Sequence, residues 1–187
     1  MNRAQSTSGE RARTVSAAIP RRPRWRWLAI TAGGIALLGA SSLKPRPLLI
    51  WNGSTSAPMG LYTVQTDQPL ARGDMVAATL VEPYRSLAIT RRYLPSEVPL
   101  IKRIAAVSGD TVCAKADQII INQRRVAVRK RIDTQKRALP YWQGCIKLGV
   151  RQYFLLMEKH AASFDGRYFG IIEAQNIIGK VRLLWPD

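Results

Sequence analysis

Residues 99–107 read PLIKRIAAV, and the fold that we predict is built around this stretch. Its apolar and β-branched residues, between a proline and a turn-forming Ser-Gly-Asp, predict a β-strand. Because side chains alternate between the two faces of a strand, Lys102 shares a face with Leu100 and Ile104. The pattern therefore predicts a lysine within an apolar row. An edge lysine whose amine reaches solvent is the alternative.

Short β-prone runs, separated by turns, occur on both sides of this strand. They are Gly60–Gln65, Met75–Leu80, Gln118–Ile121, Arg125–Arg129, Tyr153–Met157 and Ile178–Leu184. A hairpin turn is expected at Asn122-Gln123, and one helix is expected in Tyr84–Tyr93, between two prolines. Many short strands in one domain predict a mainly β fold, an antiparallel and partly closed β-barrel or sandwich.

An uncharged segment precedes this domain. Residues 27–43 read WLAITAGGIALLGASSL, which predicts a single transmembrane anchor, short but within the usual range. Seven arginines lie before it in residues 1–26, and the positive-inside rule then places this disordered basic tail in the cytoplasm. The small residues Gly39-Ala40-Ser41 leave a cleavable secretory signal as the alternative. Both interpretations export residues 48–187, so we expect a periplasmic domain at a bacterial inner membrane.

The remaining positive charge is concentrated in one part of the domain. The chain has a formal net charge of +17, and seven basic residues fall within residues 124–137. A solvated hairpin explains them, and a contact with the anionic headgroups of inner-membrane lipid is the sharper alternative. Nucleic acid is not expected as a partner, since no aromatic residues are interleaved with these charges.

The two cysteines fit an exported domain. Cys113 and Cys145 favour a structural disulfide, with two unpaired thiols as the alternative. Their spacing matches no metal signature, and we expect no cofactor.

Two short serine-containing segments could work with Lys102. A buried lysine loses its proton more easily and can then activate a serine nucleophile. Ser56 follows the uncharged segment, and Ser54 lies two residues before it, where a hydroxyl could reach a developing oxyanion. Taken alone, Ser-Thr-Ser before a proline is an ordinary linker.

The second segment is SFDGRYFG, residues 163–170. Its Asp165 and Arg167 are close enough to pair, and Ser163 could direct its hydroxyl toward a buried amine. By itself, the segment is better explained as a polar turn held by an ion pair.

Together, these motifs resemble the type I signal peptidase family (S26), and within it most closely the TraF-type peptidases of conjugative transfer systems. The matching pieces are Asn52-x-Ser54-x-Ser56-x-Pro58-x-Gly60-x-Tyr62, Ile101-Lys102-Arg103-Ile104 with Gly109-Asp110, and Ser163-Phe164-Asp165-x-Arg167-Tyr168-Phe169-Gly170. They occur in the family's order after an N-terminal anchor, and the resemblance covers roughly residues 27–187. Pro58 follows the expected nucleophile by two residues, as in the TraF-like variant, and Gly166 replaces a serine that is common in the family.

The resemblance implies a role for each of these residues. Ser56 is expected to be the nucleophile and Lys102 its general base, while Ser54 contributes to the oxyanion hole. Ser163 is expected to orient the lysine amine. Asp165 and Arg167 are expected to brace the site.

The resemblance also implies a substrate. In the TraF-type branch the expected partner is a conjugative pilin precursor, cut after small residues and released in linear or cyclic form. Three alternatives stay open: a general signal peptidase for other exported precursors, a non-catalytic assembly factor for pili or secretion systems, and a hydrolase triad through His160, the one histidine, with Asp165.

Overall fold

The computed structural model describes residues 49–187. The predicted cytoplasmic tail (residues 1–26) and the predicted anchor (residues 27–43) lie outside the described residues. Within residues 49–187, no helix is both long enough and apolar enough to cross a membrane.

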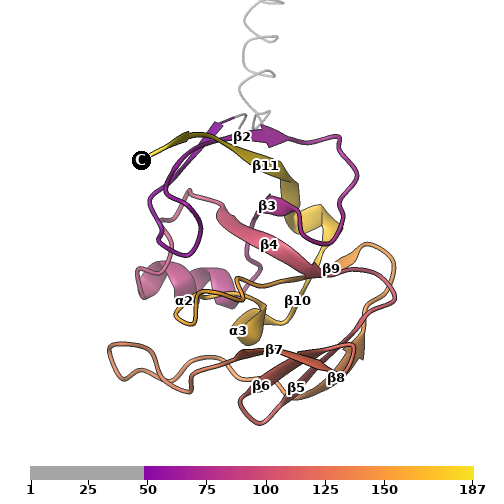
Figure 1. Ribbon diagram of the computed structural model, residues 1–187. Helices are drawn as coiled ribbons and strands as arrows, with labels where there is room; N and C mark the ends of the chain where they lie inside the picture. Colours follow the sequence, from indigo (N-terminus) through magenta and orange to yellow (C-terminus); the bar gives the residue numbers. More distant parts are fainter. Residues whose placement is uncertain (1–48) are drawn as a thin grey trace, which may run out of the picture. The chain divides into compact units, whose positions relative to one another are not determined.

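Two antiparallel sheets make up the described part of the chain (Figure 1). The larger has the strand order β1-β2-β11-β3-β4-β9-β10, and the smaller has the order β7-β6-β5-β8. The strands of the larger sheet are β1 Leu49–Asn52, β2 Gly60–Gln65, β3 Met75–Ala78, β4 Leu100–Ala106, β9 Gln152–Leu155, β10 Ile171–Glu173 and β11 Ile177–Pro186. Those of the smaller sheet are β5 Thr111–Lys115, β6 Gln118–Ile121, β7 Arg124–Val128 and β8 Gly144–Lys147.

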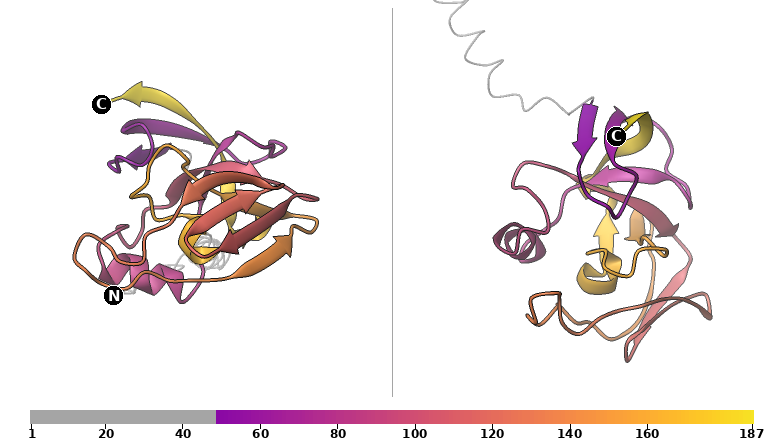
Figure 2. Two further views of the ribbon diagram at one scale, coloured as in Figure 1. Left: turned by 60° about the horizontal axis from the view of Figure 1, so that its bottom comes forward. Right: turned by 60° about the vertical axis from the view of Figure 1, so that its left-hand side comes forward.

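The mainly β, antiparallel class is therefore confirmed, but the barrel is not. Each sheet has two end strands that pair with a neighbour on one side only, so neither sheet closes on itself within residues 49–187. Figures 1 and 2 show the smaller sheet at the end of the domain opposite β2 and β11. Tight turns join β5, β6 and β7, and after a longer connection the chain returns through β8, which pairs with β5, and then enters β9.

β4 is the strand on which the packing depends. Leu100 and Ile104 belong to one hydrophobic cluster, Ile101 to a second, and Ala106 to a third that reaches the smaller sheet. The third cluster contains Phe154 of β9 together with residues of β5 and β6. Because β4 contributes to all three clusters, the position of its polar residues is tightly fixed.

Two local predictions are confirmed. The β6–β7 hairpin turns at Asn122-Gln123, where both residues have positive φ, as its tight turn requires. Cys113 of β5 and Cys145 of β8 are directly opposite each other and form a disulfide. The bond fastens the edge strand β8 to the rest of the smaller sheet.

The helices are short. α2 spans Tyr84–Thr90 and ends three residues before the predicted end, because Arg92 has positive φ and the Tyr93 N–H bonds back to the Ala88 carbonyl. α3 spans Gly166–Phe169 and a 3₁₀ turn spans Ala174–Asn176.

Candidate active site

The side chain of Asn52 organises the loop that carries Ser56. Its Nδ2 donates to the carbonyls of Ser54 at 3.0 Å, Ala57 at 3.2 Å and Pro58 at 2.9 Å. Its Oδ1 accepts from the Ser54 N–H at 3.1 Å. Asn52 ends β1 and is buried, so the loop wraps around a fixed amide.

Tyr62 holds the far end of the same loop. Its hydroxyl donates to the Pro58 carbonyl at 2.8 Å, and its ring is buried in the second hydrophobic cluster. Asn52 and Tyr62 both stand in the motif quoted above, but the sequence alone assigned them no role. Their positions on either side of the Ser54–Ser56 segment were the available signal.

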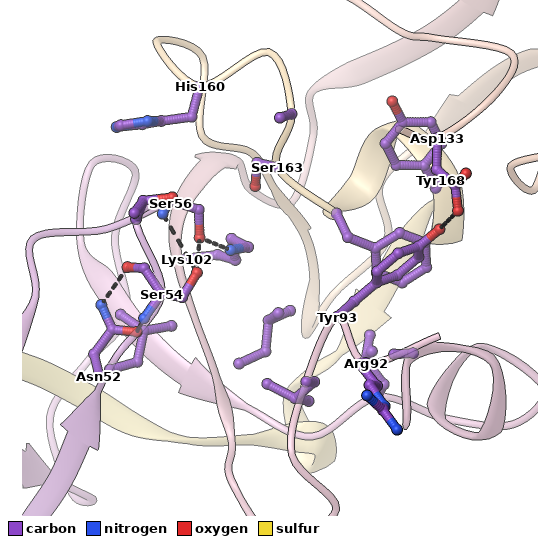
Figure 3. A pocket seen from close by; sticks show the side chains of 18 of the residues that line it. Asn52, Ser54, Ser56, Arg92, Tyr93, Lys102, Asp133, His160, Ser163 and Tyr168 are labelled. Carbon is purple, nitrogen blue, oxygen red and sulfur yellow. Dashed lines mark hydrogen bonds between the residues drawn. The ribbon is translucent and has the colours of Figure 1, made fainter. Parts of the chain in front are cut away.

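Lys102 lies against Ser56. Its Nζ donates to the Ser56 Oγ at 2.6 Å, and the lysine is only 3% exposed (Figure 3). The predicted apolar row is present, since the neighbours on its face of β4, Leu100 and Ile104, are buried. The solvent-exposed alternative for this lysine is therefore wrong.

Burial changes the acid–base behaviour of this amine. It lowers the pKa of Lys102 to about 8, since a charged ammonium is poorly solvated there. The carboxylate of Asp165 acts in the opposite direction, and the guanidinium of Arg167 adds to the lowering. A substantial neutral fraction is thus present at moderately alkaline pH, which is what a general base requires.

Ser54 lies beside the Ser56 hydroxyl. The two Oγ atoms are 3.0 Å apart, and the Ser54 Oγ also accepts from the Ser56 N–H at 3.3 Å. A hydroxyl and a backbone N–H therefore meet on one side of Ser56. This is the pair of donors that can hold an oxyanion.

Asp165 and Arg167 form a buried ion pair. They are 0% and 1% exposed, and the carboxylate accepts from the Arg167 Nε at 2.8 Å and Nη2 at 2.9 Å. Asp165 also caps α3 and accepts from the Met157 N–H, while the Arg167 Nη2 donates to the carbonyls of Met157 and His160. The pair thus fixes residues 157–160 against α3.

Gly166, between the two, leaves room for this packing. A Cβ there would lie 2.7 Å from both the Leu155 carbonyl oxygen and the ring of Phe154. Close packing against Leu155 and Phe154 therefore leaves no room for a side chain at this position.

Ser163 is 3% exposed, and its Oγ has no hydrogen-bond partner among the described residues. Figure 3 shows this hydroxyl directed toward Ser56 and Lys102. The proposed orientation of the lysine by Ser163 stays a prediction.

The His160–Asp165 alternative has no support in this geometry. The Asp165 carboxylate is fully engaged by Arg167 and by the Met157 N–H. His160 is exposed and joins this network only through its backbone carbonyl.

Ser56 and Lys102 open into a cavity of about 910 Å³. Its lining includes Leu80, Leu100 and Ile101, and Figure 3 shows Arg92, Tyr93 and Asp133 on the side away from Ser56 and Lys102. The pairing of β4 with β3 covers residues 100–103, whereas the bonds on its other edge begin with that from the Leu156 N–H to the Arg103 carbonyl. Within the described chain, one edge of β4 next to Lys102 is thus free to receive an extended peptide.

Comparison with known proteins gives a family match for most of the chain. Residues 23–185 match the profile of the family described as signal peptidase, peptidase S26. The conjugal transfer protein TraF of Agrobacterium fabrum is 31% identical over 144 residues, which cover 70% of this chain and 78% of that protein. A plasmid transfer protein TraF of Escherichia coli is 27% identical over 86% of this chain and 96% of its own.

Signal peptidases themselves are also among the matches. Signal peptidase I V of Bacillus subtilis is 31% identical over 97 residues, 46% of this chain and 58% of that protein. A solved signal peptidase I of Enterococcus faecalis is 19% identical, with a TM-score of 0.35 over 60% of this chain and 97% of its own.

Proposed function

This chain belongs to the signal peptidase S26 family, and from that premise we propose that it is a serine endopeptidase with Ser56 as nucleophile and Lys102 as general base. One observation carries the assignment. A lysine amine that burial makes easier to deprotonate lies 2.6 Å from the hydroxyl of a serine at the mouth of a cavity.

The chemistry is acyl transfer. Neutral Lys102 takes the Ser56 proton as the serine oxygen attacks the scissile carbonyl carbon. The resulting oxyanion accepts from the Ser54 hydroxyl and the Ser56 N–H. As the carbon–nitrogen bond breaks, the lysine ammonium returns its proton to the leaving amine. Water or a second amine then attacks the acyl-enzyme and releases the product.

Asp165 and Arg167 have a supporting role in this proposal. Their ion pair fixes the segment that ends at Ser163 and adds opposing charges close to the lysine. They touch no reacting atom, so we assign them to positioning the base and adjusting its pKa.

The expected client is a conjugative pilin precursor. Support comes from the two TraF proteins, named for conjugal and plasmid transfer, that align with most of this chain. Attack by the pilin's own N-terminal amine on the acyl-enzyme would give a cyclic product. The match to a Bacillus subtilis signal peptidase keeps a general signal peptidase as the second candidate.

We also propose that the domain works against the outer face of the inner membrane, tethered by residues 27–43. Exposed hydrophobic side chains flank the Ser56 loop and support this placement. They are Leu49, Trp51, Met59, Leu184 and Trp185. Strands β1 and β11 both pair with β2, which begins where the loop ends, so these side chains gather at one end of the domain.

Two substitutions test the chemistry. Ser56→Ala and Lys102→Ala should each abolish processing of a co-expressed pilin precursor, because each removes one of the two groups that move the proton. Ser86→Ala and Lys115→Ala, which change exposed residues outside the cavity, are the matched controls. Full processing by either of the first two variants would exclude this dyad. A conjugation phenotype unchanged in Ser56→Ala would favour the non-catalytic assembly factor.

Product mass separates the candidate substrates. A pilin product one water lighter than the trimmed linear peptide indicates cyclisation. Cleavage of ordinary signal-peptide precursors, with the pilin left intact, would replace the conjugative assignment by the general one.

A further inference from the structure

A second cavity lies on the other side of the Ser56 loop. It has a volume of about 670 Å³ and is lined by Pro58, two residues after the proposed nucleophile. Lys159 and His160 line both cavities. The Ser56 loop and residues 159–160 thus form the boundary between the two cavities.

β4 contributes to both cavities along its length. Leu100, Ile101 and Lys102 line the first cavity, and the next three residues, Arg103, Ile104 and Ala105, line the second. A peptide bond held at Ser56 therefore has space on both sides. If the residues before the cut occupy the cavity beside Leu100 and Ile101, those after it continue past Pro58 into the second cavity.

The second cavity is rich in arginine. Arg72, Arg103 and Arg124 line it together with Lys159, against a single carboxylate, that of Glu158, among the described lining residues. Arg72 is already held by Asp110, with Nη2 at 2.5 Å and 2.6 Å from the two carboxylate oxygens. The charge of Arg72 is therefore already paired with a carboxylate.

The other arginines are less engaged. The Arg103 Nη1 donates to the Gly73 carbonyl, which leaves its charge without a carboxylate partner in the described chain. Arg124 Nη2 lies 3.6 Å from Glu158, and both side chains are exposed, so this pair contributes little and can be exchanged. Two guanidinium groups and the Lys159 amine are thus able to bind an incoming carboxylate.

We propose that this second cavity binds the substrate segment that follows the scissile bond, and that Arg103 and Arg124 select an acidic side chain there. The inference rests on the proposed function, because it takes Ser56 as the point of cleavage. It adds a specificity determinant on the leaving-group side of the reaction.

Binding tests the proposal without requiring turnover. The probes are two fluorescent peptides of about ten residues with alanines before the intended cut, which differ only in Glu or Gln at the second position after it. They are titrated into the full chain carrying Ser56→Ala, and fluorescence anisotropy is measured. The Glu peptide should bind about fivefold more tightly at low salt, and the preference should shrink as salt is added.

Neighbouring arginines provide the matched variants. Adding Arg124→Gln should remove the preference for the Glu peptide, whereas Arg125→Gln, outside the cavity lining, should leave it unchanged. A third peptide carries Lys at the same position. The Arg124→Glu chain should bind this Lys peptide more tightly than the Glu peptide. Equal binding of the Glu and Gln peptides, or equal effects of Arg124→Gln and Arg125→Gln, would overturn the subsite.

Cleavage and lipid-binding assays distinguish this subsite from the proposed cleavage chemistry and from a lipid-binding role of the same arginines. If the chain with Ser56 intact cleaves neither peptide while the Arg124-dependent preference persists, the proposed chemistry fails and the subsite stands. If it cleaves both at equal rates and binds them equally, the chemistry stands and the subsite fails. Binding to phosphatidylglycerol vesicles that depends on Arg124, without any peptide preference, would assign these arginines to lipid instead.

Discussion

The two sides of the candidate site are held by different forces. Ser56 lies in a largely exposed loop fixed by neutral hydrogen bonds to the Asn52 amide and the Tyr62 hydroxyl. Lys102 lies in a buried row, close to the fully buried charges of Asp165 and Arg167. A charge costs far more to bury than a neutral hydrogen bond costs to break. Changes on the lysine side should therefore affect stability, and changes in the serine loop should affect rate.

Breaking the buried ion pair is the most severe test of this contrast. Arg167→Ala leaves the Asp165 carboxylate buried without its cation, and the free energy of unfolding should fall by about 3–5 kcal/mol in urea denaturation. Arg131→Ala is the control, because its pair with Asp117 is exposed, and it should cost less than about 1 kcal/mol. An equal decrease in the free energy of unfolding in the two variants would show that the buried pair matters no more than the exposed one.

On the serine side the effect should be kinetic. Ser54→Ala removes one proposed oxyanion donor, so kcat for precursor cleavage should fall by about 10²–10³-fold. The free energy of unfolding should hardly change, since Ser54 is exposed. Thr55→Ala, the adjacent exposed residue, should retain activity. A Ser54→Ala enzyme with normal kcat would show that the oxyanion is held elsewhere.

The buried charge of Lys102 should lower the free energy of unfolding, although the proposed reaction requires this lysine. Burial lowers the pKa of this amine, so at pH 7 the folded state contains a poorly solvated ammonium group. In the unfolded state water hydrates the same group freely, and the buried charge therefore lowers the free energy of unfolding. This loss is relieved as the pH rises above about 8, because the amine in the folded state is then neutral. Lys102→Met should therefore raise the free energy of unfolding at pH 7 by up to about 3 kcal/mol, although the variant is inactive. Lys115→Met, at an exposed position, should change it little. A lower free energy of unfolding for Lys102→Met would contradict the inference that the buried ammonium destabilises the folded state.

The pH dependence of activity is the mildest test. The neutral amine is the active form, so kcat/KM should increase with pH around an apparent pKa of about 8, by roughly tenfold between pH 7 and pH 9. Steady-state rates with a short peptide across this range measure it. A flat profile, or one that decreases over the same range, would exclude Lys102 as the base.

Strand alternation predicted an apolar row around Lys102, although it left a solvent-exposed edge lysine as the alternative. PLIKRIAAV has enough apolar residues to define both faces, and the observed β4 buries the lysine as expected. The boundaries of Gly60–Gln65 and Gln118–Ile121 also agree with the structure. In each case the local sequence contains the whole signal.

Other features depend on distant contacts that a pattern does not encode. β8 is an exposed four-residue edge strand that is defined by its pairing and disulfide with β5. α3 has only four residues and exists because Asp165 caps it and Gly166 packs against Leu155. The loop-closing role of Asn52 required the positions of three carbonyl groups at once. The open sheets likewise depend on which strands become neighbours.

The position of β11 has a consequence for how the protein is made. β11 is the last strand along the described chain, yet it lies between β2 and β3, which do not pair with each other. Before Ile177–Pro186 leaves the ribosome, the β1–β2 hairpin that holds the Ser56 loop has no sheet connection to β4. The two halves of the proposed site therefore belong to one continuous sheet only when β11 is in place, and domains fold as units once complete. We therefore expect the proposed Ser56–Lys102 pair to be assembled only in completed chains.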